Sequence, residues 1–368
     1  MNSSFYERCR SFWQWFEKNE ATLSDMCENR EKYGQKEVTG FIAEGLERVG
    51  GLCFNIGGDH EFTLAVNGNR ALFYLLPYLT AGMPEKYRDK WTFFPYMQPG
   101  DVSNFAFHMS GKELTMADIL LDCKYEEDYE CFSLAFYHEA LLDLPENDRY
   151  NLFFTALDLC LGEALSLKYI GEVKQASAPV SGMVPLGSLR EYMEETLKNQ
   201  GKELKLHPGR TYSSYSFKPQ EDENLRYDVI AGMTACMELI QDYYGGEYRT
   251  ADTMEEFGAK ATFLWFQYGE EDDRSEILNL RYEMEESLDK EVFGACERED
   301  GEMPESIYEG NETGRVLGGA MGAERVYLDV LIFDEEQFDH KIKDWAGKYP
   351  YTIYKSEFKQ GAESERVL

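Results

Sequence analysis

The sequence lacks the features that mark secreted, membrane-spanning and disulfide-stapled proteins. Its first residues, Met1 to Arg8, contain no basic region followed by an apolar run, so we expect no secretory signal. No apolar stretch approaches the roughly 18 uninterrupted residues that span a bilayer. The 8 cysteines are scattered, include no Cys-x-x-Cys pair, and lie mostly in apolar segments. This pattern favours buried thiols in a reducing cytoplasm over disulfides or zinc.

Positive charge is scarce. The chain holds 37 Lys and Arg against 69 Asp and Glu, which gives a net charge of −32. Such a charge repels phosphate backbones and anionic headgroups, so nucleic-acid and membrane-surface partners are disfavoured. It suits a basic protein partner, or it serves solubility alone, because net charge governs association and not the fold.

Catalytic and metal-binding signatures are also missing. The 5 histidines show no metal-ligand spacing, and no Gly-x-Ser-x-Gly or other activated nucleophile occurs. The pair His138-Glu139 could be a base with its orienter, but a partly exposed histidine at a strand end explains it more simply. The acidic runs Glu270 to Asp273 and Asp334 to Glu336 precede helices, where the helix dipole accounts for them. We therefore predict no metal and no cofactor.

What the 368-residue chain does contain is ample core material, with 43% hydrophobic and 14% aromatic residues. The first 50 residues predict two amphipathic helices, and Gly50-Gly51 ends the second. Trp13 lies beside the apolar stripe of the first helix. Trp15 lies off that stripe, and we interpret it as the marker of an interface between subunits or domains.

Strands and helices then follow in the order β-β-α-β, three times. The first unit comprises residues 52–56, 61–66, 70–79 and 91–97, and the second comprises 116–123, 129–137, 146–165 and 167–173. The third comprises 315–320, 324–333, 334–345 and 351–358. This order predicts an α+β protein whose mixed or antiparallel sheets carry helices on one face.

A change in composition divides the chain. Residues 200–224 are rich in Pro, Gly and Ser, end in an acidic run, and form the best candidate linker. We predict an N-terminal domain over 1–219 and a C-terminal domain over 220–368. The latter should begin with a strand at 226–231, a helix through Cys236 that ends near Gly246, a strand at 261–268 and a helix from Asp272.

The glycine-rich segment from Gly314 to Gly322 is the most unusual local feature. Small residues let a backbone approach a ligand, so Gly318, Gly319, Met321 and Gly322 are candidate ligand-binding residues. A hairpin with a β-bulge explains the same glycines without a ligand, and this interpretation is preferred.

Two further residues are ligand-site candidates. Asp329 interrupts an apolar strand: a buried acid would need a partner and would indicate function, whereas the solvent face, which we favour, would make it ordinary. Cys236 stands at a strand-to-helix junction, where helix N-terminal amides could stabilise a thiolate. An inert core thiol is the preferred alternative.

Two segments resemble known bacterial families. The opening Phe12-Trp13-x-Trp15-Phe16-x-x-Asn19-Glu20 resembles the start of an uncharacterised family, in which a hairpin-helix-strand unit and a motif like Leu161-Gly162-Glu163 follow. Residues 228–237, 244–247, 258–259 and 317–322 resemble a second domain of unknown function with a Gly-Gly-Ala-x-Gly hairpin. The resemblance implies a fold, and it brings no activity and no catalytic residues.

These features favour a non-enzymatic cytoplasmic binding protein, with neutralisation of a basic partner in the manner of an immunity protein as its sharpest form. The alternative is an enzyme or small-molecule binder with a pocket near Gly318-Gly319, where Asp329 or Cys236 would supply polar groups. A third hypothesis is a structural module that dimerises through an open sheet edge or through the aromatic N-terminal helices.

Overall fold

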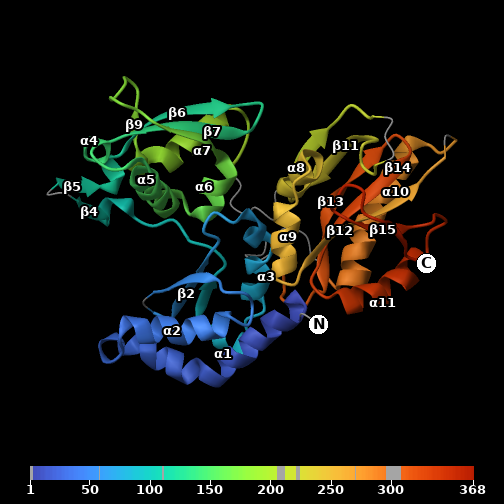
Figure 1. Cartoon of the computed structure of the whole chain (residues 1–368), viewed down its shortest axis with the longest axis horizontal. Helices are drawn as coiled ribbons and strands as arrows, with labels where there is room; N and C mark the ends of the chain where they lie inside the picture. Colours follow the sequence, from blue (N-terminus) through green and yellow to red (C-terminus); the bar gives the residue numbers. More distant parts are fainter. Residues whose placement is uncertain are drawn as a thin grey trace.

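The structure is a computed structural model that describes residues 3–57, 59–109, 112–204, 212–220, 224–269, 271–295 and 308–368. Parts of the expected linker, together with Glu270, Cys296 and His207, lie outside these residues. Within the described residues the fold is α+β, as the sequence predicts, with mixed and antiparallel sheets (Figure 1). No helix in this part of the chain is long and apolar enough to cross a membrane.

The chain begins with the two predicted helices, α1 (Phe5–Glu28) and α2 (Gln35–Leu46), joined through the short turn η1 (Arg30–Lys32). Ser4 and Glu7 form a capping box that satisfies free amides at the start of α1. Trp15 is buried between α1 and α2, with its ring 5.5 Å from that of Phe41. The interpretation of Trp15 as a marker of an interface between subunits or domains is therefore wrong, because α2 covers the off-stripe face of α1.

The first predicted β-β-α-β unit is present, with β1 and β2 antiparallel and β2 and β3 parallel. Its helix is split into a 3-10 turn and one short α-helix, because Pro77 sits at a helix start. The elements are β1 (Cys53–Ile56), β2 (Glu61–Ala65), η2 (Arg70–Tyr74), α3 (Leu76–Ala81), η3 (Glu85–Tyr87) and β3 (Thr92–Phe94).

The second unit forms a four-stranded sheet in the order β8-β7-β6-β9, with helices on one face. A small hairpin, β4–β5, and helix α7 were not predicted. The elements are η4 (Val102–Asn104), β4 (Ala106–Met109), β5 (Lys112–Thr115), η5 (Met116–Asp118), β6 (Leu120–Glu126), β7 (Cys131–Tyr137), α4 (Glu139–Leu142), α5 (Glu146–Leu161), α6 (Glu163–Tyr169), β8 (Ile170–Gln175), β9 (Val184–Pro185), η6 (Leu186–Ser188) and α7 (Leu189–Asn199).

Glu163 joins the first two units. The predicted long helix breaks at Gly162, which has φ 75°, and this break turns Glu163 toward the first unit. Its buried carboxylate accepts hydrogen bonds from the backbone N–H groups of Val66, Asn67 and Met97, at 3.0, 2.8 and 3.0 Å. Three charge-assisted bonds fix one unit on the other.

The remaining strands form an antiparallel seven-stranded sheet in the order β10-β11-β13-β14-β12-β15-β16. Asp273 caps α10, and Gly246 ends α8 in a left-handed conformation, both where the sequence predicts. The elements are β10 (Ser213–Ser216), β11 (Val229–Thr234), α8 (Met237–Gly245), α9 (Arg249–Glu256), β12 (Lys260–Gln267), α10 (Arg274–Ser287), the π-helical turn η8 (Leu288–Phe293), β13 (Gly314–Gly322), β14 (Arg325–Ile332), α11 (Glu335–Ala346), β15 (Tyr354–Glu357) and β16 (Glu365–Arg366).

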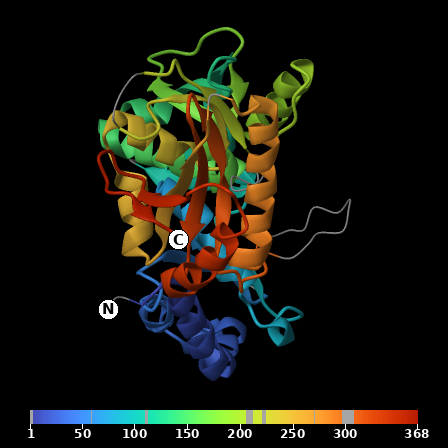
Figure 2. The same cartoon turned by 90° about the vertical axis from the view of Figure 1, so that its right-hand side faces the viewer.

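Helices cover both faces of this sheet (Figure 2). Phe263 and Tyr327 face α8 and the N-terminal elements, whereas Leu264 and Leu328 face α10 and α11. The prediction of helices on one face is too narrow here, because β14 is apolar on both faces and each face needs a cover.

The cores connect segments that are far apart in the sequence. Residues 5–96 share one hydrophobic core with the face of the seven-stranded sheet that carries Phe263 and Tyr327. Residues 102–197 enclose a core of their own. At the join, Phe5 N–H donates to Gly258 O at 2.8 Å, and the rings of Phe5 and Phe333 lie 5.4 Å apart. The domain boundary near residue 220 stays a prediction, and the N-terminal helices pack on the sheet that lies beyond it.

Candidate functional sites

The glycine-rich segment is strand β13, in the interior of the seven-stranded sheet between β11 and β14. The register shifts between Val316 and Gly318, which is the bulge that the sequence suggested, and Gly318 has φ +135°. A side chain at Gly318 would lie 2.1 Å from Met233 O, and one at Gly319 would lie 2.4 Å from Tyr327 O. The glycines thus permit close packing of backbone against backbone.

Asp329 lies opposite Gly318 on β14 and is buried, so its expected solvent-facing position is wrong. The guanidinium of Arg226 donates to both carboxylate oxygens, through Nη1 to Oδ1 and through Nη2 to Oδ2 at 3.1 Å. Burial raises the pKa of Asp329, and the charge of Arg226 opposes that rise. A buried acid needs a cation, and Arg226 supplies it from outside the strand.

Aromatic rings enclose the Arg226 guanidinium. Its central carbon lies within 5.0–6.0 Å of four ring centres, and Nη2 also donates to the hydroxyl of Tyr215 at 2.9 Å. Such rings stabilise a cation by their quadrupoles. The four are Tyr243, Phe263, Tyr327 and Phe358. The chain fills this aromatic enclosure with its own arginine, so the enclosure serves to stabilise the fold.

A second pair of charges approaches the same glycines from the other face. Glu285 of α10 lies over Gly319, and its Oε1 is 3.3 Å from Arg281 Nε. Burial raises the pKa of Glu285 to about 7; Arg281 opposes the rise, and Asp329 adds to it.

Sequence reasoning did not find Arg226, Arg281 or Glu285. Arg281 carried a usable signal, since it stands four residues after Ile277 and three before Met284, on the same face of the helix as these apolar residues. Arg226 carried no such signal, because its partner, Asp329, is 103 residues away in the chain.

Cys236 is the N-cap residue of α8 and is fully buried. Burial raises the pKa of its thiol well above the ordinary value, and the carboxylate of Glu238 acts in the same direction. The Tyr74 hydroxyl lies beside it, donating to Ala235 O at 3.0 Å and to Glu238 Oε2 at 3.1 Å. Burial and the raised pKa therefore favour the inert core thiol over an activated thiolate.

The structure brings only some of the candidates together. Gly318, Gly319 and Asp329 are neighbours. Cys236 follows Ala235, whose N–H donates to Leu317 O at 2.7 Å, whereas Met321 and Gly322 lie at the C-terminal end of β13. A side chain at Gly322 would lie 2.1 Å from Asp228 Oδ2. Met321 is partly exposed.

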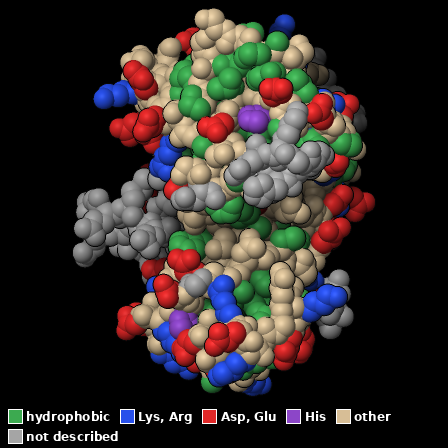
Figure 3. All heavy atoms as spheres, turned by 90° about the vertical axis from the view of Figure 1, so that its left-hand side faces the viewer, with side chains coloured by type: hydrophobic (Ala, Val, Ile, Leu, Met, Phe, Trp, Pro, Cys, Tyr) green, Lys and Arg blue, Asp and Glu red, His purple; other side chains and the backbone are tan. Residues whose placement is uncertain are grey.

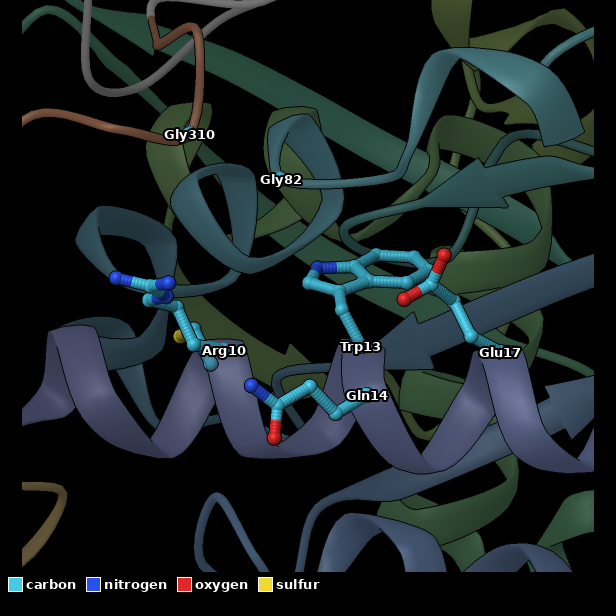
Figure 4. A pocket seen from close by; sticks show the side chains of 7 residues that line it. Arg10, Trp13, Gln14, Glu17, Gly82 and Gly310 are labelled. Atoms are coloured by element: carbon cyan, nitrogen blue, oxygen red, sulfur yellow. The ribbon is translucent and has the colours of Figure 1, made fainter.

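A cavity of about 240 Å³ lies elsewhere, on the surface between α1, the end of α3 and Gly310 (Figure 4). Arg10 and Glu17 stand at its two ends with Gln14 between them, and Glu17 pairs with Lys86 at 2.7 Å. The Trp13 indole donates to Leu79 O at 2.8 Å. Cys9 also lines the cavity, and burial raises the pKa of its thiol. The lining is mostly polar, and burial disfavours the thiolate form of Cys9.

The described residues hold no group of three or more His, Cys, Asp and Glu side chains that could bind a metal ion. His138 caps α4, with its Nδ1 accepting from Ala140 N at 3.1 Å. His60 Nε2 lies 2.7 Å from Ser24 Oγ and 3.3 Å from Glu28 Oε1. Both contacts use the same ring nitrogen, so they do not form a Ser-His-acid relay.

Comparison of the chain with protein-family models, with curated proteins and with solved structures finds no match.

Proposed function

We propose that this chain is a non-enzymatic binding protein of the cytoplasm that recognises a basic protein, as an immunity-type protein would when it neutralises a toxic partner. The observation that carries the proposal is where the charges lie. At the centre of the large sheet, Asp329 is paired with Arg226 and Glu285 with Arg281. The surplus of carboxylates that gives the net charge of −32 therefore lies mainly at the surface.

Local excess of acid is visible even where cations are present. Lys355 lies within 3.9 Å of carboxylate oxygens from Glu335, Asp339 and Glu365. Glu37 and Glu44 of α2 and Glu47, which directly follows α2, are all exposed. Acidic side chains are spread over the face shown in Figure 3 and do not gather at one point. The surplus of carboxylates produces a negative electrostatic potential over a wide surface. This potential attracts a basic partner and repels nucleic acid.

The cysteines support a reducing compartment. The seven within the described residues are free, and Cys9, Cys160 and Cys236 are buried. Free thiols of this kind are typical of intracellular proteins.

The test is purification of the tagged protein from its native host at about 50 mM and about 500 mM salt, with native mass spectrometry of what is bound. Surface charge is screened within about 10 Å at 0.1 M salt, so a stoichiometric basic partner should be retained at low salt and lost at high salt. Glu37→Gln/Glu44→Gln/Glu47→Gln should weaken retention. Lys36→Gln, on the same helix, is the matched control and should not.

Retention that is indifferent to salt and to these substitutions, or recovery of the bare protein at both salts, would contradict the proposal. The alternative of a small-molecule site near Gly318-Gly319 gains no supporting observation, because Met233 O, Tyr327 O and Glu285 occupy the space beside those glycines.

A further inference from the structure

The two ends of the seven-stranded sheet differ. Among the described residues, β10 is the outermost strand at one edge and β16 is the outermost at the other. β16 comprises only Glu365 and Arg366, and short charged strands are typical of protected edges. β10 has the sequence Ser-Ser-Tyr-Ser, without charge or proline, and pairs with β11 without a register shift. Apart from its length of 4 residues, β10 carries none of the usual edge protection within the strand itself.

The register shows which backbone groups point outward. Phe217 N–H donates to Ile230 O at 3.0 Å, which makes this pair hydrogen-bonded. Hydrogen-bonded pairs alternate along an antiparallel ladder, so Tyr215 and Ser213 also bond to β11. The N–H and C=O groups of Ser214 and Ser216 therefore point away from β11, toward the place of a further strand.

Apolar side chains flank this edge on both faces of the sheet. On one face the ring of Phe217, which is 39% exposed, lies 4.3 Å from that of Tyr244. On the other face Met233, which is 40% exposed, stands opposite Ser214. An added strand would find the outward N–H and C=O groups of Ser214 and Ser216 as backbone partners, with apolar side chains beside it on both faces of the sheet.

We propose that the outer edge of β10 binds an extended segment of the basic partner as an eighth strand. This inference rests on the proposed function and specifies which part of the chain contacts the partner. Strand addition supplies hydrogen bonds through the backbone, while charge selects the partner. A second copy of this chain is disfavoured as the occupant, because two copies would bring net charges of −32 together. A segment that alternates lysine with apolar residues carries charge opposite to the net charge of this chain, and it presents apolar side chains to one face of the edge.

The experiment uses the full chain and a fluorescent octapeptide of alternating lysine and valine, with binding followed by anisotropy at low salt. Ser214→Pro/Ser216→Pro removes two outward N–H groups and leaves the β10–β11 ladder intact, since proline is tolerated where an edge N–H faces solvent. We expect at least tenfold weaker binding than for wild type. Ser214→Ala/Ser216→Ala, the matched control, retains both N–H groups and should bind as wild type does.

A second measurement keeps the protein unchanged. An octapeptide with N-methyl groups along one backbone edge has the same charge but cannot complete the ladder, so wild-type protein should bind it at least tenfold more weakly. Hydrogen exchange at the Ser214 and Ser216 amides should slow when the unmodified peptide binds. Equal binding of both peptides, or no binding of either, would overturn strand addition. So would a wild-type dimer that the proline variant abolishes.

The failures of the two proposals are distinguishable. If the host partner is retained at low salt by wild type and equally by the proline variant, the proposed function stands and the β10 edge is wrong. If no salt-sensitive partner is retained by either protein, the proposed function itself fails.

Discussion

The side chains of Arg226 and Asp329, 103 residues apart in the chain, form a two-point ion pair in which neither member is more than 1% exposed. Arg226 itself has φ +68°, and its backbone is held at both ends: its N–H donates to the Tyr327 hydroxyl at 2.9 Å, and its C=O accepts from the Tyr244 hydroxyl at 2.6 Å. The pair fixes the turn before β11 against β14.

Arg226→Met should lower the free energy of unfolding by about 3–5 kcal/mol, because Asp329 would stay buried without its cation. Urea denaturation measures the loss. Arg226→Met/Asp329→Leu should recover most of it, since it removes both charges. Arg249 pairs with Glu247 on the surface, at 83% and 54% exposure, so Arg249→Met should change stability by less than about 0.5 kcal/mol. Equal effects of the two single variants would show that the buried pair does not stabilise the fold.

Glu163→Gln should loosen the attachment between the first two β-β-α-β units. A neutral amide offers one acceptor oxygen to three backbone N–H groups, and we expect a loss of about 2 kcal/mol. Hydrogen exchange should accelerate specifically at the amides of Val66, Asn67 and Met97. A general loss of stability would instead accelerate exchange throughout the protein. Glu195→Gln, at an exposed position of α7, is the control. Unchanged protection of the three amides would contradict this role.

Two glycines of α2 provide a matched pair. A Cβ at Gly45 would lie 2.3 Å from the Trp15 ring, whereas a Cβ at Gly40 meets nothing within 4 Å. Gly45→Ala should therefore destabilise the protein by about 1–3 kcal/mol through overpacking. Gly40→Ala should stabilise it by up to about 1 kcal/mol through helix propensity. Thermal denaturation of the two variants tests the contact, and effects of the same sign would argue against it.

Glu285 should make stability depend on pH. Its pKa is raised to about 7 in the folded protein, above the ordinary value of 4.5, so the folded state binds the proton more tightly than the unfolded state. Stability from this group is thus present at low pH and is lost as pH rises from about 4.5 through about 7.

Glu285→Gln should match wild type near pH 5 and exceed it near pH 8, by about 1–3 kcal/mol, because the amide cannot ionise. Urea denaturation at the two pH values measures this difference. Asp158, whose pKa burial raises to about 6, contributes in the same direction to both proteins and cancels in the comparison. Glu286→Gln, one residue away and exposed, should follow the wild-type profile. A wild-type profile for the Glu285→Gln variant would rule out Glu285 as the titrating group.

Local signals in the sequence predicted most elements but not the way in which they assemble. Asp273 and Gly246 marked helix ends because capping is a matter of a few neighbouring residues. The bulge at Gly318 was predictable for the same reason. The sequence could not show that the helix after Glu146 breaks at Gly162, because the break is stabilised by amides from the first unit.

The candidate site depended still more on distant partners. Asp329 was expected at the surface because acids are rarely buried, and the cation that permits its burial is remote in the chain. Cys236 was considered for its helix position, whereas the pKa of its thiol is raised chiefly by burial, which the local sequence does not show.

The sequence by itself determined the acidic charge, the α+β class and the main strands and helices of the three β-β-α-β units, because these follow from composition, periodicity and local turn chemistry. Only the tertiary structure decided which residues are buried, which charges pair, that helices cover both faces of the large sheet, and that β10 is left at its edge. Burial and strand pairing bring together residues that are far apart in the chain. No local sequence pattern specifies which distant residue will pack against or pair with a given residue.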